Sequence, residues 1–188
     1  MDHYQDLKIL PDPEFSPPML LNALFAKLHR QLAAQQSTQV GISFPKIDPQ
    51  RPTLGKVLRL HGTHQALSNL HQQSWIKGMR DHLEMGEISP IPENVQHCQI
   101  RRVQAKSNAA RLRRRYQKRH EGVTEADAQK LIPDSVEKRL NLPFLQLKSE
   151  STNQRFCLFI EQRPAQEHAQ QGEFNSYGLS RDATVPVF

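Results

Sequence analysis

Residues 17–32 read PPMLLNALFAKLHRQL, and the first half of the chain is organised around them. Apolar residues recur along this stretch at helical spacing and gather on one face of a helix. Two prolines open it, which suits a first helical turn whose N–H groups have no intrahelical partner. The apolar face comprises Leu20, Leu21, Leu24, Phe25, Leu28 and Leu32. We therefore predict a core-facing helix, with His29 at the border of its apolar face.

Strand-like segments surround this helix. We expect strands at residues 3–9 (HYQDLKI), 39–44 (QVGISF), 55–60 (GKVLRL) and 80–85 (RDHLEM), and a second helix at 63–73. The resulting order β-α-β-β-α-β is that of the split-βαβ, or ferredoxin-like, pattern. The prolines of SPIPEN at 89–94 then indicate a linker or a turn. The first half is thus predicted to be a ferredoxin-like domain of residues 1–92.

The remaining residues, 93–188, are predicted to form a second domain that also mixes helices and strands. Thr124 and Asp134 have the character of helix N-caps, because their short oxygen-bearing side chains can accept from the first turn. Further strands are expected at residues 145–149, 155–160 and 174–179. The predicted class is α+β: an N-terminal ferredoxin-like domain followed by a C-terminal α+β domain that carries an arginine-rich helix.

That helix belongs to residues 101–120, RRVQAKSNAARLRRRYQKRH, which hold nine Lys or Arg residues and no Asp or Glu. The whole chain has a net charge of +6, so the other residues sum to −3. The basic character is therefore one local patch on a mildly acidic protein. Such a patch indicates a polyanionic partner, most often nucleic acid.

The basic stretch divides into a strand and a helix. Alternation places Arg102 and Gln104 on one strand face, and Ser107 or Asn108 can cap a helix that runs from residue 109 to 120. One face of this helix carries Arg111, Arg114, Arg115, Lys118 and Arg119. A solvated helix face would ordinarily mix charges of both signs at i,i+4 spacing, and this face has no acidic partner. We therefore favour a polyanion-binding helix over a merely solvated one.

Other function classes find little support in the sequence. It contains no Walker-type loop, GxGxxG, HExxH or GxSxG motif, and no cluster of carboxylates typical of a two-metal nuclease. Cys98 and Cys157 lie far apart without a CxxC motif, which suits a reducing cytoplasm rather than a zinc site or a disulfide framework. The apolar run at 19–28 is too short to span a membrane. We expect a soluble cytoplasmic protein without a metal or other cofactor.

Several ordered motifs carry a family resemblance. They are MDHYQDLKILPDPEF at 1–15, LFAKLH at 24–29, VGISFP at 40–45, RVQAKSN at 102–108, RLRRR at 111–115, LPF at 142–144, SESTNQRF at 149–156 and SYGLS at 176–180. Together they resemble the CRISPR-associated endoribonuclease of subtype I-F, from Met1 to Phe188. The resemblance implies metal-independent cleavage of CRISPR precursor RNA on the 3′ side of the repeat stem-loop, by 2′-hydroxyl attack that leaves a 2′,3′-cyclic phosphate. It also implies that the product stays bound, together with the other protein subunits of the I-F surveillance complex.

The resemblance assigns catalytic roles to three residues. His29 falls on the family's catalytic histidine, and histidine titrates nearest neutrality among possible bases. Ser149 falls on the serine that holds the attacking 2′-hydroxyl, and Tyr177 on the active-site tyrosine that orients His29 or the scissile phosphate. Without the resemblance, each has an ordinary structural explanation: a packed helix histidine, a strand-end serine and a core tyrosine.

The remaining matches concern RNA recognition. Arg102 and Gln104 match a pair that reads base edges near the foot of the stem, since arginine suits guanine and glutamine suits adenine. Phe156 matches an aromatic residue that stacks on the terminal base pair. Ser107, Asn108, His120 and Ser151 complete the predicted RNA-binding set, with the five cations of the helix. Lys118 and Glu150 depart from the family pattern and could change affinity or repeat preference.

Two other functions stay open at this point. The basic helix alone would equally support a non-catalytic subunit that binds an RNA hairpin within a ribonucleoprotein. A DNA-binding regulator has less support, because no helix-turn-helix pair is evident. The joint occurrence of His29, Ser149 and Tyr177 favours the enzyme.

Overall fold

The computed structural model describes residues 1–48, 50–104, 109–136, 140–149 and 152–188. Within these ranges the chain forms four α-helices and sheets whose strands pair in antiparallel fashion, which confirms the predicted mixture of helices and strands. It divides into two compact units: residues 1–103 with 142–188, and residues 104–141. The predicted domain boundary near residue 92 stays a prediction.

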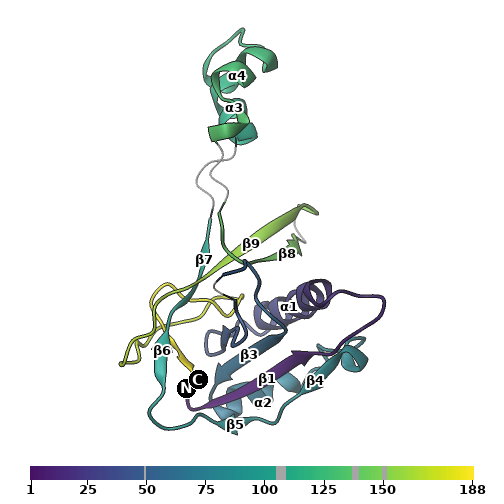
Figure 1. Cartoon of the computed structure of the whole chain (residues 1–188), viewed down its shortest axis with the longest axis vertical. Helices are drawn as coiled ribbons and strands as arrows, with labels where there is room; N and C mark the ends of the chain where they lie inside the picture. The colour runs from purple at the N-terminus through teal and green to yellow at the C-terminus, as the bar shows by residue number, and fades with distance from the viewer. Residues whose placement is uncertain (49, 105–108, 137–139, 150–151) are drawn as a thin grey trace. The chain divides into compact units, whose positions relative to one another are not determined.

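The largest sheet is built around its central strand, β1 (His3–Ile9) (Figure 1). Its other strands are β2 (Gly41–Ser43), β3 (Val57–Gly62), β4 (Leu83–Met85) and β5 (Ser89–Pro90). The path runs β2-β3-β1-β4, and β5 also pairs with β1. Leu7 and Ile9 of β1 point into the core, while Asp6 and Lys8 alternate to the other face. The alternating pattern HYQDLKI therefore produced the strand that it predicted.

Two helices pack against β1. Helix α1 (Pro17–Ala34) begins at the first of the two predicted prolines, and every residue of the predicted apolar face is buried. Helix α2 (His64–His71) is capped by Thr63, whose hydroxyl accepts from the N–H of Ala66 at 3.1 Å. Residues 80–85 were predicted as one strand, and only the second half is one. A 3₁₀ turn occupies Arg80–His82, where the His82 N–H bonds back to the carbonyl of Met79.

Two smaller sheets complete this unit. The first pairs β6 (Gln96–Cys98) with β10 (Val185–Val187), and the second has the order β7 (Ile100–Val103), β9 (Arg155–Gln162), β8 (Phe144–Lys148). Helix α1 packs on β8 and joins the second sheet to the core. The last strand predicted at 174–179 was wrong: these residues form a turn, because Asn175 bonds to the backbone two and four residues later and Gly178 has φ +68°.

The second unit contains α3 (Ala109–Arg119), α4 (Glu125–Leu131) and a 3₁₀ turn at Asp134–Val136. Thr124 caps α4 as predicted, since its hydroxyl accepts from the Asp127 N–H at 3.2 Å. Asp134 is the first residue of the 3₁₀ turn rather than the residue that precedes it, and its carboxylate pairs with Arg113 at 2.6 Å. Arg113 also donates to the carbonyl of Ile132, so this arginine holds α3 against the end of α4.

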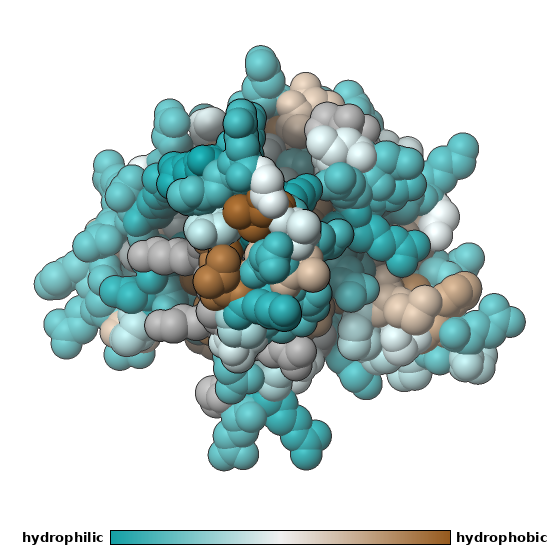
Figure 2. Space-filling model, turned by 90° about the horizontal axis from the view of Figure 1, so that it is seen from above, coloured by the Kyte–Doolittle hydropathy of each residue, from teal (hydrophilic) through white to brown (hydrophobic). Residues whose placement is uncertain are grey.

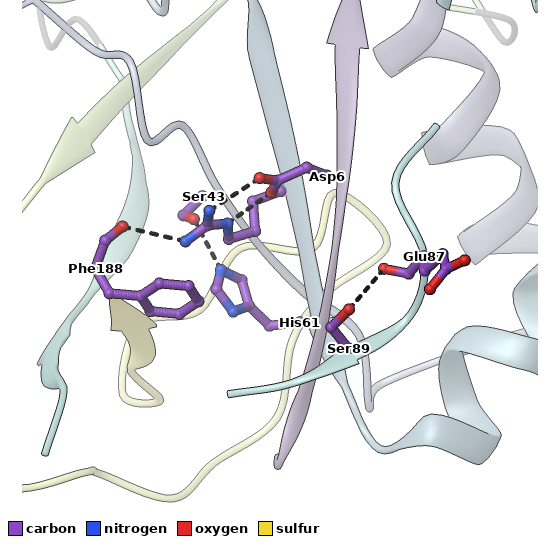
Figure 3. A network of polar contacts seen from close by, with 7 residues as sticks. Asp6, Ser43, His61, Glu87, Ser89 and Phe188 are labelled. Carbon is purple, nitrogen blue, oxygen red and sulfur yellow. Dashed lines mark hydrogen bonds and ion pairs between the residues drawn. The ribbon is translucent and has the colours of Figure 1, made fainter. Parts of the chain in front are cut away.

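A polar network lies on the other face of the main sheet (Figure 3). Arg59, Ser43 and His61 are buried, whereas Asp6 and Phe188 are partly exposed. The guanidinium of Arg59 on β3 donates twice to the Asp6 carboxylate, at 2.6 and 2.9 Å, and once to the main-chain oxygen of Phe188 at 3.2 Å. It also lies over the Phe188 ring, 4.0 Å from the centroid. Beside it, His61 Nε2 and Ser43 Oγ are 2.8 Å apart. This network ties the end of the chain to the central strands.

Candidate active site

His29 lies at the edge of the apolar face of α1, directly after the fully buried Leu28. Its ring is half-buried and stacks on Tyr177, with centroids 4.0 Å apart and planes inclined by 6°. Phe25, one helical turn earlier, lies nearly parallel to the same tyrosine at 6.4 Å. Residues four apart share a helix face, so Phe25 and His29 together form the wall against which Tyr177 stacks.

The Nδ1 atom of His29 lies 2.8 Å from the main-chain oxygen of Ser176. A carbonyl oxygen can only accept a hydrogen bond, so Nδ1 carries the proton and donates it. In a neutral imidazole the other nitrogen, Nε2, is then the acceptor. The backbone at Ser176 therefore fixes the tautomer in which Nε2 can take a proton from another molecule.

Ser149 follows β8 in the turn between β8 and β9. Its N–H donates to the carbonyl of Gln154 at 2.9 Å, and its Oγ accepts from the Thr152 N–H at 3.3 Å. Leu147 and Phe156 are partners across the hairpin, so their side chains share one face. The hairpin thereby presents Ser149 and Phe156 on the side where His29 lies.

A cleft of about 590 Å³ brings these segments together. Its lining consists of Ala26, His29, Arg30, Leu147, Lys148, Ser149, Asn153, Phe156 and Tyr177. The three predicted catalytic residues, which lie far apart in the sequence, thus line a single cleft. Among the described lining residues, the charged side chains other than His29 are Arg30 and Lys148. Both are cationic, which favours a phosphate-bearing ligand.

Of the two predicted base-reading residues, only Arg102 lies in a strand. Arg102 lies in β7, is exposed, and places its guanidinium 5.8 Å from the centroid of the Phe156 ring. Its neighbour Arg101 differs, because it pairs with Glu161 of β9. Gln104 lies beyond the end of β7 and opens the second compact unit, so the predicted strand face did not extend to it.

Helix α3 separates its side chains as its sequence predicts. All five predicted cations and His120 are exposed, whereas Leu112, Arg113, Tyr116 and Gln117 are half-buried. The exposed set is Arg111, Arg114, Arg115, Lys118, Arg119 and His120. Figure 2 shows that hydrophilic side chains cover most of the surface it presents, with few hydrophobic residues among them. Ser107, Asn108 and Ser151 lie outside the described residues.

Comparison with known proteins places the chain in a family. A sequence model described as CRISPR-associated protein (Cas_Csy4) matches residues 4–188. The chain belongs to this family. Two relatives named CRISPR-associated endonuclease Cas6/Csy4 are similar over all 188 residues, covering the whole of both sequences. The relative from Pseudomonas aeruginosa (strain UCBPP-PA14) is 47% identical, and that from Escherichia coli (strain UTI89 / UPEC) is 45% identical. The family resemblance read from the motifs is thus confirmed.

Sequence reasoning missed several parts of this cleft. Arg30 and Lys148 line the cleft. The only signal of this in the sequence is that they are the neighbours of His29 and Ser149. The Ser176 carbonyl leaves no signal in a sequence, because every residue has one. Among the described residues, no three His, Cys, Asp or Glu side chains gather as metal ligands would, and no helix is long and apolar enough to cross a membrane.

Proposed function

We propose that the protein is an endoribonuclease that cuts CRISPR precursor RNA on the 3′ side of the repeat stem-loop, without a metal ion. The observation that carries this proposal is the bond from His29 Nδ1 to the Ser176 carbonyl, in a cleft that Ser149 and Tyr177 also line. It leaves the basic nitrogen of the ring as an acceptor. Both relatives are named as endonucleases, which supports the same class of activity here.

The proposed reaction uses a nucleophile of the RNA itself. His29 Nε2 removes the proton from the 2′-hydroxyl upstream of the cut, and the resulting oxygen attacks the adjacent phosphorus. The bond from phosphorus to the 5′-oxygen of the next nucleotide breaks, and that oxygen takes a proton. The products are a 2′,3′-cyclic phosphate and a 5′-hydroxyl end. Ser149 positions the 2′-hydroxyl, while the stacked Tyr177 holds the plane of the His29 ring.

The two cleft cations have a role in this reaction. Negative charge on the phosphate oxygens rises as the fifth bond to phosphorus forms. Arg30 and Lys148 line the cleft beside His29 and Ser149. Positive charge fixed at this place stabilises the transition state more than the ground state.

Recognition of the stem-loop is proposed for a separate set of residues. The exposed cations of α3, with His120, contact successive phosphates, since the helix rises about 1.5 Å per residue. Arg102 and Gln104 read guanine and adenine edges near the foot of the stem. Phe156, already in contact range of Arg102, stacks on the terminal base pair. Ser107, Asn108 and Ser151 add polar contacts to the RNA.

The finer description of the fold and its setting is also a proposal. The order β2-β3-β1-β4 with α1 and α2 on β1 supports a ferredoxin-like domain at 1–92 that carries the catalytic histidine. Residues 93–188 then form the RNA-binding domain with its arginine-rich helix. The enzyme keeps its product and joins the other protein subunits of the I-F surveillance complex in the cytoplasm.

Single-turnover cleavage of a labelled repeat hairpin in excess chelator tests the mechanism. We expect a cyclic phosphate on the upstream product and undiminished rates with chelator. One 2′-deoxy substitution just upstream of the cut should abolish cleavage and leave most binding intact, because the stem contacts remain. Cleavage of the deoxy substrate, or a strict need for divalent metal, would overturn the 2′-hydroxyl mechanism. Tight binding of the natural hairpin with no cleavage would instead identify a non-catalytic RNA-binding subunit.

A further inference from the structure

We propose that Asn175 is a positioning residue for the reaction, because it holds the peptide group that selects the tautomer of His29. The inference rests on the proposed role of His29 as the base. It concerns a residue that is not among those lining the cleft, and that acts through the backbone between Ser176 and Tyr177.

The contact between His29 and Ser176 is one end of a chain of hydrogen bonds. The Ser176 carbonyl and the Tyr177 N–H belong to the same planar peptide group, in which the two polar groups point in opposite directions. Asn175 Oδ1 accepts from the Tyr177 N–H at 2.9 Å, and the Ser176 oxygen accepts from His29 Nδ1 at 2.8 Å. Asn175 therefore bonds to the N–H of this peptide group, and His29 bonds to its carbonyl.

The rest of the turn keeps that peptide in place. Asn175 Oδ1 also accepts from the Leu179 N–H at 3.3 Å, and its own carbonyl accepts from the Gly178 N–H at 2.8 Å. Gly178 has φ +68°, and its oxygen accepts from the N–H of Ile42 on β2 at 3.0 Å. A Cβ at this glycine would lie only 2.7 Å from Ile42 Cγ2, so the turn packs directly on the sheet edge.

The direction of this peptide decides which ring nitrogen of His29 carries the proton. With the carbonyl facing the ring, Nδ1 must donate and Nε2 is the base. A rotated peptide would present its N–H to the ring, Nδ1 would have to accept, and the proton would move to Nε2. That second tautomer cannot take a proton at Nε2. Stacking on Tyr177 fixes the plane of the ring but makes no in-plane bond that would discriminate between the two.

Three variants test the inference in the full-length protein. Asn175→Ala removes both side-chain bonds of the turn, and the residue is exposed, so no core packing is lost. Asn175→Asp keeps an acceptor oxygen at the same place. Ser180→Ala is the matched control, because it removes three hydrogen bonds from the same segment but none from the turn at 175–179.

The first readout is the tautomer of the His29 ring, measured without RNA by proton–nitrogen correlation NMR of the ¹⁵N-labelled protein above the pH at which the ring is protonated. The second is the single-turnover cleavage rate across pH. We expect Asn175→Ala to convert much of the ring to the Nε2–H form and to slow cleavage about tenfold, the factor that one hydrogen bond represents. Asn175→Asp and Ser180→Ala should keep the Nδ1–H form.

An Asn175→Ala protein that keeps the wild-type tautomer overturns the inference, whatever its cleavage rate. An equal shift of tautomer in Ser180→Ala overturns it too, since general loosening of the segment would then explain the change. A shifted tautomer in Asn175→Ala with restored Asn175→Asp supports it. If the tautomer shifts and the cleavage rate does not, Asn175 selects the tautomer but has no role in the reaction, and the proposed role of His29 as the base fails.

Discussion

Two histidines of the same compact unit show how differently one side chain can be used. His29 is half-buried at the border of α1, donates from Nδ1 to a carbonyl and lines a cleft. His61 is fully buried on β3, and its Nε2 lies against the hydroxyl of Ser43. Burial, and to a lesser degree the nearby Arg59, lowers the pKa of His61 to about 3.

The partner atom makes the difference. A carbonyl fixes the tautomer of His29, whereas the hydroxyl of Ser43 can either donate or accept and leaves the tautomer of His61 open. Among the described residues His61 Nδ1 has no hydrogen-bond partner, and no solvent reaches the ring. His61 is thus kept neutral as part of the core, while His29 is placed where it can exchange a proton with a ligand.

The largest expected effect separates the two histidines by activity. His29→Ala should lower the single-turnover cleavage rate by about 10²- to 10⁴-fold, because it removes the proposed base. His61→Gln should leave the rate per folded molecule close to wild type, since His61 is remote from solvent. The folded fraction of each variant is measured by circular dichroism. Equal losses of rate in both variants would contradict the division of roles.

The second prediction concerns pH and the stability of the core. Between about pH 6.5 and pH 3 the unfolded chain protonates His61 and the folded chain does not. The free energy of unfolding should therefore fall as the pH falls, by on the order of 1 kcal/mol per pH unit. Half-buried His71, whose pKa burial also lowers, adds to this in the same direction. Urea denaturation of wild type and His61→Gln isolates the His61 part, and parallel pH curves would contradict it.

A third prediction compares two acidic partners of the same sheet. Asp6→Ala leaves the buried guanidinium of Arg59 without its carboxylate and should cost about 3 kcal/mol of unfolding free energy. Glu84→Ala breaks the ion pair between Lys8 and Glu84, in which both side chains are more than half exposed. Its unfolding free energy should stay within about 1 kcal/mol of wild type. Urea denaturation at pH 7 measures both changes. Similar losses would mean that burial does not determine how much these ion pairs contribute to the unfolding free energy.

The smallest expected effects distinguish two arginines of α3. Arg115 is exposed, so Arg115→Ala should weaken binding of all repeat hairpins and reduce the slope of log affinity against log salt by about one unit. Arg113 is bonded to Ile132 and Asp134, so Arg113→Ala should destabilise α3 and α4 and leave that slope unchanged. Filter binding over a salt series, with hydrogen exchange of α3, reads out both. An unchanged slope in Arg115→Ala would show that this residue does not contact phosphate.

Local signals predicted the parts of the fold that depend on local causes. The alternation in residues 3–9 predicted β1 to the residue, and the two prolines at 17 and 18 marked the start of α1. The exposed face of α3 also followed from helical spacing alone. In β1, α1 and α3 the apolar residues recur at the period of the element, and the structure buries or half-buries the face that they form.

The parts that alternation describes wrongly, or that depend on distant contacts, were missed. Residues 174–179 alternate like a strand, but the bonds of Asn175 and the packing of Gly178 on Ile42 make them a turn. The strand ending at Val103 left Gln104 outside the ladder, which alternation could not show. His29, Ser149 and Tyr177 were predicted by family resemblance, whereas their common cleft and the carbonyl that orients His29 required the structure.

The bond between His29 and Ser176 joins residues that lie 147 positions apart. At a translation rate of about 5–20 residues per second, the histidine exists for roughly 7–30 s before its carbonyl partner has been made. Within that interval the chain completes α1, which ends at Ala34, and the main sheet, which ends at Pro90, before it holds the turn that bonds to His29. Synthesis of the proposed base and acquisition of its reactive tautomer are thus separated in time, so RNA near the translating ribosome meets the complete proposed site only after Tyr177 has been added.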